Sequence, residues 1–212
     1  MDREEDVRLL RGGKYGIAEW NRSREDVIAE LNRCLKDGGA WPSPEADLSE
    51  TDFSNTDLRG AQLTWANLRR ANLNKAILSE VDLYQANLSE ANLSEADLFE
   101  ANLGEANLTK ANLRRAELGG ASFIHADLTL ADLSGANLYY TNFSEAHLHE
   151  AILADAQCGT TVFSCDLSEV VALDKIEHSG PSTISVAAML SFKGALPERF
   201  LRGCGIEIED IH

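Results

Sequence analysis

Two histidines and a glutamate stand close together in the second half of the chain. His147, His149 and Glu150 are residue types that can donate ligands to a metal ion. A metal site needs its ligands to converge on one point, whereas alternation along an extended segment would direct both histidines toward solvent. We therefore predict that these residues are polar surface groups, and that the protein binds no metal and no cofactor.

The thiol and hydroxyl groups that could act as nucleophiles lack the motifs that catalysis requires. The closest pair of cysteines is seven residues apart, which is not a metal-ligand spacing; the four are Cys34, Cys158, Cys165 and Cys204. Cys158 is predicted to be a small core residue, and Ser182, which follows Pro181, is predicted to cap a helix. No Gly-x-Ser-x-Gly, Walker, Rossmann or His-Glu-x-x-His motif occurs. We predict that the protein is not an enzyme.

Acidic residues dominate the charge of the chain. Its 212 residues include 35 acids against 19 Lys and Arg, for a formal net charge of -16 and a hydrophobic content of 44%. This balance repels nucleic acid and anionic membranes, and it suits a basic protein partner. No apolar run reaches the roughly 20 residues that span a bilayer, and the acidic start is unlike a secretory signal. We expect a cytoplasmic protein with reduced thiols.

A repeat of five residues organises the chain from Ala46 to Cys165. Each unit reads Ala, then Asn or Asp, then Leu, then two variable residues, and we call the Leu position the centre. The 24 centres lie at 48, 53, 58 and every fifth residue to 163; 19 are Leu, four are Phe and one is Cys158. A period of five fits neither a helix, near 3.6, nor a flat strand, at 2.0. It fits a solenoid whose coils direct Leu and Ala inward, while Asn or Asp favours the turns.

The repeat resembles the pentapeptide-repeat family. Residues 86–90 and 91–95 both read Ala-Asn-Leu-Ser-Glu, and residues 96–100 read Ala-Asp-Leu-Phe-Glu. This resemblance implies an all-β solenoid, a right-handed quadrilateral β-helix with four repeats per coil. The 24 repeats would then form about six coils. At about 4.8 Å per coil the tower would be about 29 Å tall.

Four repeats per coil would stack residues that are 20 apart in the sequence. Two outward columns would then alternate in charge: Glu50, Arg70, Glu90 and Lys110 in one, and Lys75, Glu95 and Arg115 in the other. Inward, the same register predicts a core with one aromatic stack. Its structural residues include Leu48, Phe53, Leu98, Phe123, Phe143 and Phe163.

The two ends of the chain lack the repeat and are predicted to cap the tower. Residues 1–45 are predicted as a helical N-terminal cap, 46–170 as the β-helix, and 171–212 as a C-terminal helical cap or linker. Within this last part, a helix is predicted from Ser182 to about residue 190 and a short helical turn at 197–202. Residues 178–182 and 200–205 are similar to a segment that joins pentapeptide repeats to a Toll/interleukin-receptor-type domain in some bacterial proteins. We expect a monomer, or a dimer formed through the caps.

One outward column differs from the alternating charges and is predicted to face a partner. Glu80 and Glu100 would stack without an opposite charge, and Phe99 and Tyr139 would flank a shallow depression over two glycines. Aromatic residues are enriched at binding hot spots, although single exposed aromatics are common on any surface. The predicted surface comprises Glu80, Phe99, Glu100, Gly119, Gly120, Tyr139 and Tyr140.

Three functions are compatible with these features. We prefer a non-enzymatic protein–protein interaction module or scaffold, without direct binding to nucleic acid or membrane. The family resemblance also implies a DNA mimic that binds and protects a topoisomerase such as gyrase. However, the repeat region holds 17 acids and seven bases, whereas a duplex of about 29 Å carries about 17 negative charges. A sensor arm of a signalling or defence system is the third interpretation, and it depends on the C-terminal resemblance.

Overall fold

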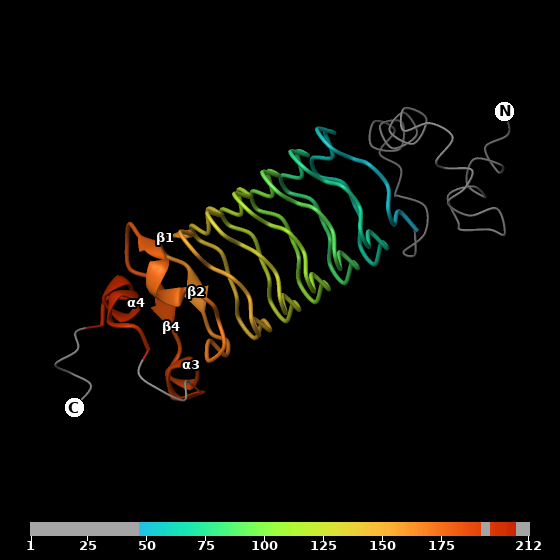
Figure 1. Cartoon of the computed structure of the whole chain (residues 1–212). Coiled ribbons are helices and arrows are strands. Elements are labelled where there is room, and N and C mark those ends of the chain that lie inside the picture. The colour runs from blue at the N-terminus through green and yellow to red at the C-terminus, as the bar shows by residue number, and fades with distance from the viewer. Residues whose placement is uncertain (1–46, 192–195, 207–212) are drawn as a thin grey trace, which may run out of the picture.

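The computed structural model describes residues 47–191 and 196–206, which form a tower of stacked coils (Figure 1). Parallel bridges join residues that are 20 apart, such as Asp47 to Asn67 and Asn67 to Asn87, so each coil consists of four pentapeptides. Each side of a coil contributes one bridged residue between two turns, and for this reason the regular coils contain bridges rather than longer strands. The N-terminal cap predicted at residues 1–45 lies outside the described residues.

The pentapeptides with centres from Leu48 to Leu153 end in a β-turn that makes a corner of the coil. The amide three residues after a centre donates to the carbonyl of that centre, as from Ala91 N to Leu88 O at 3.0 Å. The second residue after the centre has a positive φ, for example 57° at Glu95, which is the arrangement of a type II turn. The Asn or Asp before the centre accepts the amide two residues later, as from Ser94 N to Asn92 Oδ1 at 3.2 Å. The sequence pattern therefore specifies the corner through local hydrogen bonds.

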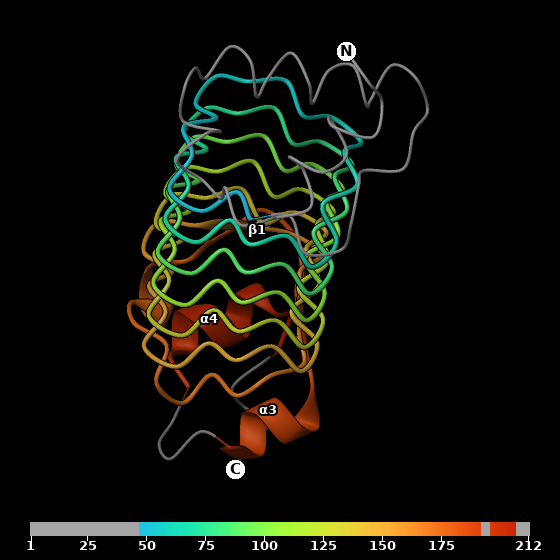
Figure 2. The same ribbon diagram turned by 90° about the vertical axis from the view of Figure 1, so that its right-hand side faces the viewer.

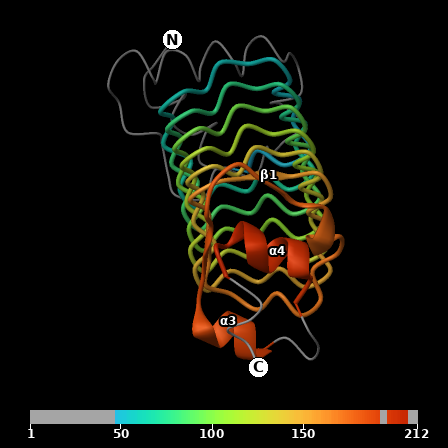
Figure 3. The same ribbon diagram turned by 90° about the vertical axis from the view of Figure 1, so that its left-hand side faces the viewer.

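Four columns of corners run along the tower, and we number them by their order in the chain. The first begins at residues 49–50, the second at 54–55, the third at 59–60 and the fourth at 64–65, and each recurs every 20 residues. Figures 2 and 3 show from two sides how the coils stack in register. A corner side chain therefore has its neighbours in the coils before and after it.

The core consists of the inward centres and the small residues beside them. All 24 centres from residue 48 to residue 163 are at most 1% exposed. The rings of Phe123, Phe143 and Phe163 are stacked, with centroids 5.2 and 5.7 Å apart. Where Thr161 replaces Ala, its hydroxyl donates to the carbonyl of Leu138 at 2.7 Å. The buried hydroxyl of Thr161 is thus hydrogen-bonded within the core.

The coil after Phe163 has lost the repeat but still continues the tower. Strand β1 (Gln157–Cys158) pairs in parallel with β3 (Glu177–His178), and β2 (Val162–Phe163) pairs with β4 (Thr183–Ile184). Bridges also join His147 to Asp166 and Ile152 to Val171. Parallel pairing therefore extends to residue 184, beyond the boundary predicted at residue 170.

Each column consequently contains seven bridged residues, one coil more than the six that the repeat predicted. The spacing to this last coil is 19 residues in two columns, 20 in the third and 21 in the fourth. Leu167 and Ile176 are buried like centres, with 0% and 1% exposure. A search for a strict period of five does not find this coil, because one of its corners has fewer residues than the repeat and later corners have more.

The C-terminal residues cover the last coil. They form the 3-10 helix η2 (Leu173–Lys175) and the helices α3 (Val186–Ser191) and α4 (Glu198–Gly203). Helix α4 lies across the end of the tower (Figure 3). Its Phe200 contacts Phe163 edge to face, with centroids 5.4 Å apart, and so prolongs the aromatic stack. None of the described helices is long and apolar enough to cross a membrane.

The predicted helix cap at Ser182 is wrong. Ser182 is buried, and strand β4 lies between it and α3. The hydroxyl of Ser185 instead accepts the amide of Ala188 at 3.1 Å, which is the geometry of an N-cap. Residues 183–184 adopt an extended conformation because they pair with the preceding coil, so the helix begins only at Val186.

Candidate functional site

The predicted partner surface lies on the third corner, in four consecutive coils. The amide of Glu100 donates to the carbonyl of Gly119, and the amide of Gly120 donates to the carbonyl of Tyr139, both at 2.8 Å. These bonds hold successive coils in register. The residues that they bring together are Glu80, Phe99, Glu100, Gly119, Gly120, Tyr139 and Tyr140, and we call this set the aromatic corner.

Two aromatic rings of this corner lie over glycines of the next coil. A Cβ on Gly119 would be 3.3 Å from Cδ2 of Phe99, and a Cβ on Gly159 would be 2.7 Å from Cε1 of Tyr139. The depression predicted between the two rings is therefore wrong, because the Phe99 ring occupies the space above Gly119. Close approach of a ring to the backbone is possible only where no side chain stands.

The same arrangement occurs on the fourth corner, where sequence reasoning missed it. The Tyr84 ring lies over Gly104, with Cδ2 3.2 Å from the position of a Cβ. All three pairs combine an aromatic residue with a glycine 20 residues later. This spacing of 20 residues between an aromatic residue and a glycine is the sequence signal that could have identified all three ring–glycine contacts.

Two aromatic side chains of the aromatic corner remain open to a partner. Phe99 is 49% exposed and Tyr140 is 67% exposed, whereas Tyr139 is half-buried. Trp65 on the fourth corner is also exposed, but its indole N–H donates to Gln85. A ring that already rests on the backbone loses little conformational freedom on binding. Phe99 is thus a preorganised apolar contact.

The carboxylates of Glu80 and Glu100 have no hydrogen bond or ion pair with any other described residue. They occupy successive coils of one column, so their charges repel each other. Glu105 on the fourth corner differs, because it accepts bonds from the Tyr84 hydroxyl and from Gln85 Nε2. The hydrogen bond from Tyr84 contributes most, and with the bond from Gln85 it holds the pKa of Glu105 below its ordinary value. The two carboxylates of the aromatic corner are therefore available to a cation.

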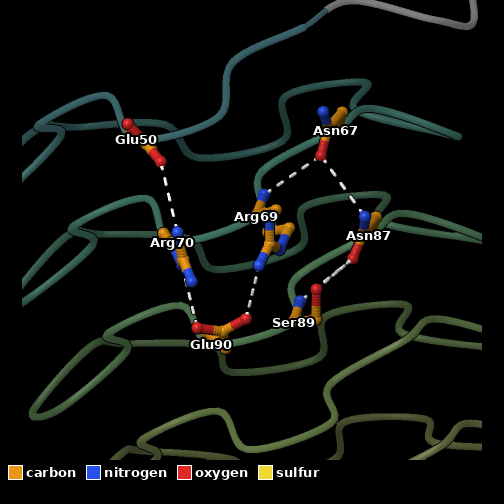
Figure 4. A network of polar contacts seen from close by, with 7 residues as sticks. All are labelled: Glu50, Asn67, Arg69, Arg70, Asn87, Ser89 and Glu90. Carbon is orange, nitrogen blue, oxygen red and sulfur yellow. Dashed lines mark hydrogen bonds and ion pairs between the residues drawn. The ribbon is translucent and has the colours of Figure 1, made fainter.

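In the first three coils, the charges on the first corner pair with one another (Figure 4). Arg70 lies between Glu50, with Nη1 3.6 Å from Oε1, and Glu90, with Nε 2.8 Å from Oε2. Arg69 adds a contact of 2.7 Å from Nη2 to Glu90 Oε1. Hydrogen bonds from Arg69 and Arg70 hold the pKa of the Glu90 carboxyl below its ordinary value. A partner would have to replace these contacts to bind here.

The predicted alternation does not continue as ion pairs along the whole of either column. Lys75 pairs with Glu95, with Nζ 3.5 Å from Oε2. Within the described part of the chain, neither Lys110 nor Arg115 makes an ion pair. Glu90 and Glu95 are already engaged by the bases of the preceding coil. A further exposed pair would gain little against the entropy of ordering two long side chains.

A hollow of about 390 Å³ marks the shortened corner after Phe163. Centres 163 and 167 are four residues apart, so this corner lacks its second turn residue. His147 and His149 line the hollow, and His149 pairs with Glu169 through Nδ1 and with Glu150 at 3.6 Å. Among residues 47–191 and 196–206, no three His, Cys, Asp or Glu side chains are grouped so that they could hold a metal ion.

The described thiols are held in their neutral form. Burial raises the pKa of Cys158 and of Cys165 to about 12, and the pKa of Cys204 to about 11. A nucleophilic cysteine needs a lowered pKa and access to substrate. Cys158 occupies a centre and is fully buried, so it fills the core. Cys34 lies outside the described residues.

One histidine and one serine meet at the C-terminal end of the tower. The Ser182 hydroxyl lies 3.2 Å from Nδ1 of His178, whose ring also packs edge-on against Phe200. Nε2 of His178 has no partner among the described residues. Burial, and then the charge of Arg199, lower the pKa of His178. Because Ser182 is only 4% exposed, this pair packs the end of the tower and presents no nucleophile to solvent.

Comparison with protein families identifies the repeat. The family described as pentapeptide repeats matches residues 45–74, 76–115 and 116–155, in eight copies. The match covers more than half of the chain. A comparison with the sequences of curated proteins found no match.

Solved structures with the same fold include QnrB1, a plasmid-mediated fluoroquinolone resistance protein. Its identity is 14% and its TM-score 0.60, over 78% of this chain and 81% of that one. HetL, a pentapeptide repeat protein involved in heterocyst differentiation regulation from the cyanobacterium Nostoc, is 22% identical with a TM-score of 0.41, over 74% and 96% of the two chains. At 14% identity, the likeness to QnrB1 is one of fold alone.

Proposed function

Because the chain belongs to the pentapeptide repeat family, whose members form right-handed quadrilateral β-helices, we propose that it is a non-enzymatic protein-interaction module. The tower is the rigid scaffold, and the aromatic corner binds a partner protein. One observation carries this proposal. Exposed Phe99 and Tyr140 share a corner with two carboxylates, Glu80 and Glu100, that have no partner among the described residues.

The first corner offers a partner less to gain. On the first corner each of Arg70 and Glu90 is already paired, so a new contact would only replace an existing one. On the aromatic corner a partner would add contacts without removing any. Apolar area supplies affinity there, and the unpaired charges supply orientation and specificity.

Capture of the partner from extract of the source cells by the tagged full-length chain tests this function. The double variant Phe99→Ser with Tyr140→Ser should keep its circular dichroism spectrum and lose capture. Tyr140 is the better choice than Tyr139, because Tyr139 packs against Gly159. The matched control is Trp65→Ser with Leu130→Ser, which removes exposed apolar area from the fourth and first corners. Capture that survives in the double variant, or that the control loses equally, would contradict the proposal.

Mimicry of DNA is the second candidate, and the likeness of fold to a fluoroquinolone resistance protein favours considering it. The charge argues against it. The repeat region carries seven bases among its 17 acids, and Arg69 with Arg70 and Arg114 with Arg115 form dense positive spots. A duplex of equal length, with about 17 phosphates, has no such spots. We therefore rank this candidate below the interaction module.

A further inference from the structure

Lys and Arg are concentrated on one half of the tower. Of the seven Lys and Arg between residues 47 and 166, six stand on the first and second corners. The exception is Arg59 on the third corner, which pairs with Asp57 at 2.7 Å. The third and fourth corners, and the walls leading to them, carry eight acids and all the corner aromatics: Trp65, Tyr84, Phe99, Tyr139 and Tyr140. A partner that complements this half carries positive charge and an apolar group.

The backbone of the aromatic corner has no edge to which a strand could add. The amide of Glu80 donates to Phe99 O at 2.8 Å, and the amide of Tyr140 donates to Gly159 O at 3.0 Å. Strand addition depends on unpaired main-chain groups. A partner must therefore bind this side of the tower through its side chains.

The spacing of the column matches an α-helix that lies along it. Successive coils are about 4.8 Å apart, and the pitch of a helix is about 5.4 Å. Glu80 and Glu100 occupy successive coils, so they can face positions i and i+4 of one helix. The Phe99 ring leans one coil further, over Gly119, and Tyr140 stands one coil beyond that glycine. These groups fall opposite positions i+7 and i+11, on the same helix face.

We propose that the aromatic corner binds a basic amphipathic helix of a partner protein, an inference that rests on the proposed function. Lys or Arg at i and i+4 pairs with Glu80 and Glu100, and apolar residues at i+7 and i+11 contact Phe99 and Tyr140. The described helices of this chain, α3 and α4, have six residues each and are too short to fill this role in a second copy. The whole chain has a formal net charge of -16, so a second copy would be repelled from this acidic corner, and the proposed occupant is a different, basic protein.

Two fluorescein-labelled helical peptides of about 18 residues test this partner class against the full-length protein. Both have the same composition; one has Arg at i and i+4 with Leu at i+7 and i+11, and the other distributes these residues around the helix. By fluorescence anisotropy, the aligned peptide should bind about tenfold more tightly than the other.

Variants assign the binding to this corner. Glu80→Gln with Glu100→Gln should weaken the aligned peptide about tenfold. The control Glu95→Gln with Asp155→Asn removes two charges from the second corner and should leave the affinity unchanged. Equal affinity of the two peptides, or an equal loss in both variants, overturns the inference. Failure of both peptides to bind, while capture of the native partner still requires Phe99 and Tyr140, overturns the helical partner but leaves the proposed function intact.

Discussion

The first and third corners are built on the same backbone, but their side chains are engaged differently. Both have positive φ at the second turn residue, and both bond one coil to the next through the same amide. At the first corner Glu50, Arg70 and Glu90 form a chain of ion pairs. At the third, Glu80 and Glu100 have no partner among the described residues. The two turn residues of each corner are therefore free to vary, because the interior and the backbone hydrogen bonds hold the tower together.

The largest expected effect is the difference in stability between an interior substitution and a corner substitution in the same pentapeptide. Leu98 is 0% exposed, so Leu98→Asp buries an unpaired carboxylate and should cost several kcal/mol, or about 10 °C or more in thermal midpoint. Glu100→Lys should change the midpoint by about 1 °C or less, upward, because it removes the repulsion from Glu80. Thermal unfolding followed by circular dichroism measures both. Similar midpoints would contradict the inward and outward assignment.

The next effect concerns the aromatic rings that rest on glycines. Gly159→Ala places a Cβ 2.7 Å from the Tyr139 ring, which must move away, and the variant should lose about 1–3 kcal/mol in the free energy of unfolding. Gly180→Ala is the matched control, since a Cβ there meets no atom within 4 Å. Urea denaturation should show this control within about 0.5 kcal/mol of the parent. A loss of equal size in both variants would mean that the ring contact contributes nothing.

A smaller effect should appear at the first corner, with a defined dependence on pH. Hydrogen bonds from Arg69 and Arg70 lower the pKa of Glu90 from its ordinary 4.5, so the ionised form is favoured in the folded protein. This contribution is fully present above pH 4.5 and is lost as the pH falls through the lower folded pKa. Glu90→Gln should therefore lower the thermal midpoint slightly at pH 7, and less at high salt. A midpoint difference that persists at pH 2 would exclude the ion pairs as its cause.

No effect at all is expected in a gyrase assay. The bases on the first and second corners interrupt the negative surface that a mimic of duplex DNA needs. Supercoiling by gyrase in the presence of a quinolone should be unchanged when the protein is added at a stoichiometric amount. Restored supercoiling would reverse our ranking of the two proposed functions.

The regular coils and the columns of the aromatic corner follow from the sequence because their determinants are short-range. An Asn or Asp before each centre bonds its own turn, as Asn92 does with Ser94. A constant unit of five then brings Phe99, Gly119 and Tyr139 into one column. The seventh coil could not be predicted in this way. The residues of this coil lie 19, 20 or 21 positions after those they pair with, and this irregular spacing is recognised only from the pairing of all four columns.

The sequence by itself determined the period, the identity of the inward residues and the column to which each corner residue belongs. The columns follow from this period once each coil has four repeats, which the family resemblance implied and the bridges show: residue n then lies above residue n+20. The tertiary structure alone decided the conformations of those side chains. Phe99 leans over Gly119 and fills the expected depression, Arg70 engages Glu90, and Lys110 makes no ion pair among the described residues. Exposed side chains have several rotamers of similar energy, and contacts with the neighbouring coil determine which rotamer is populated.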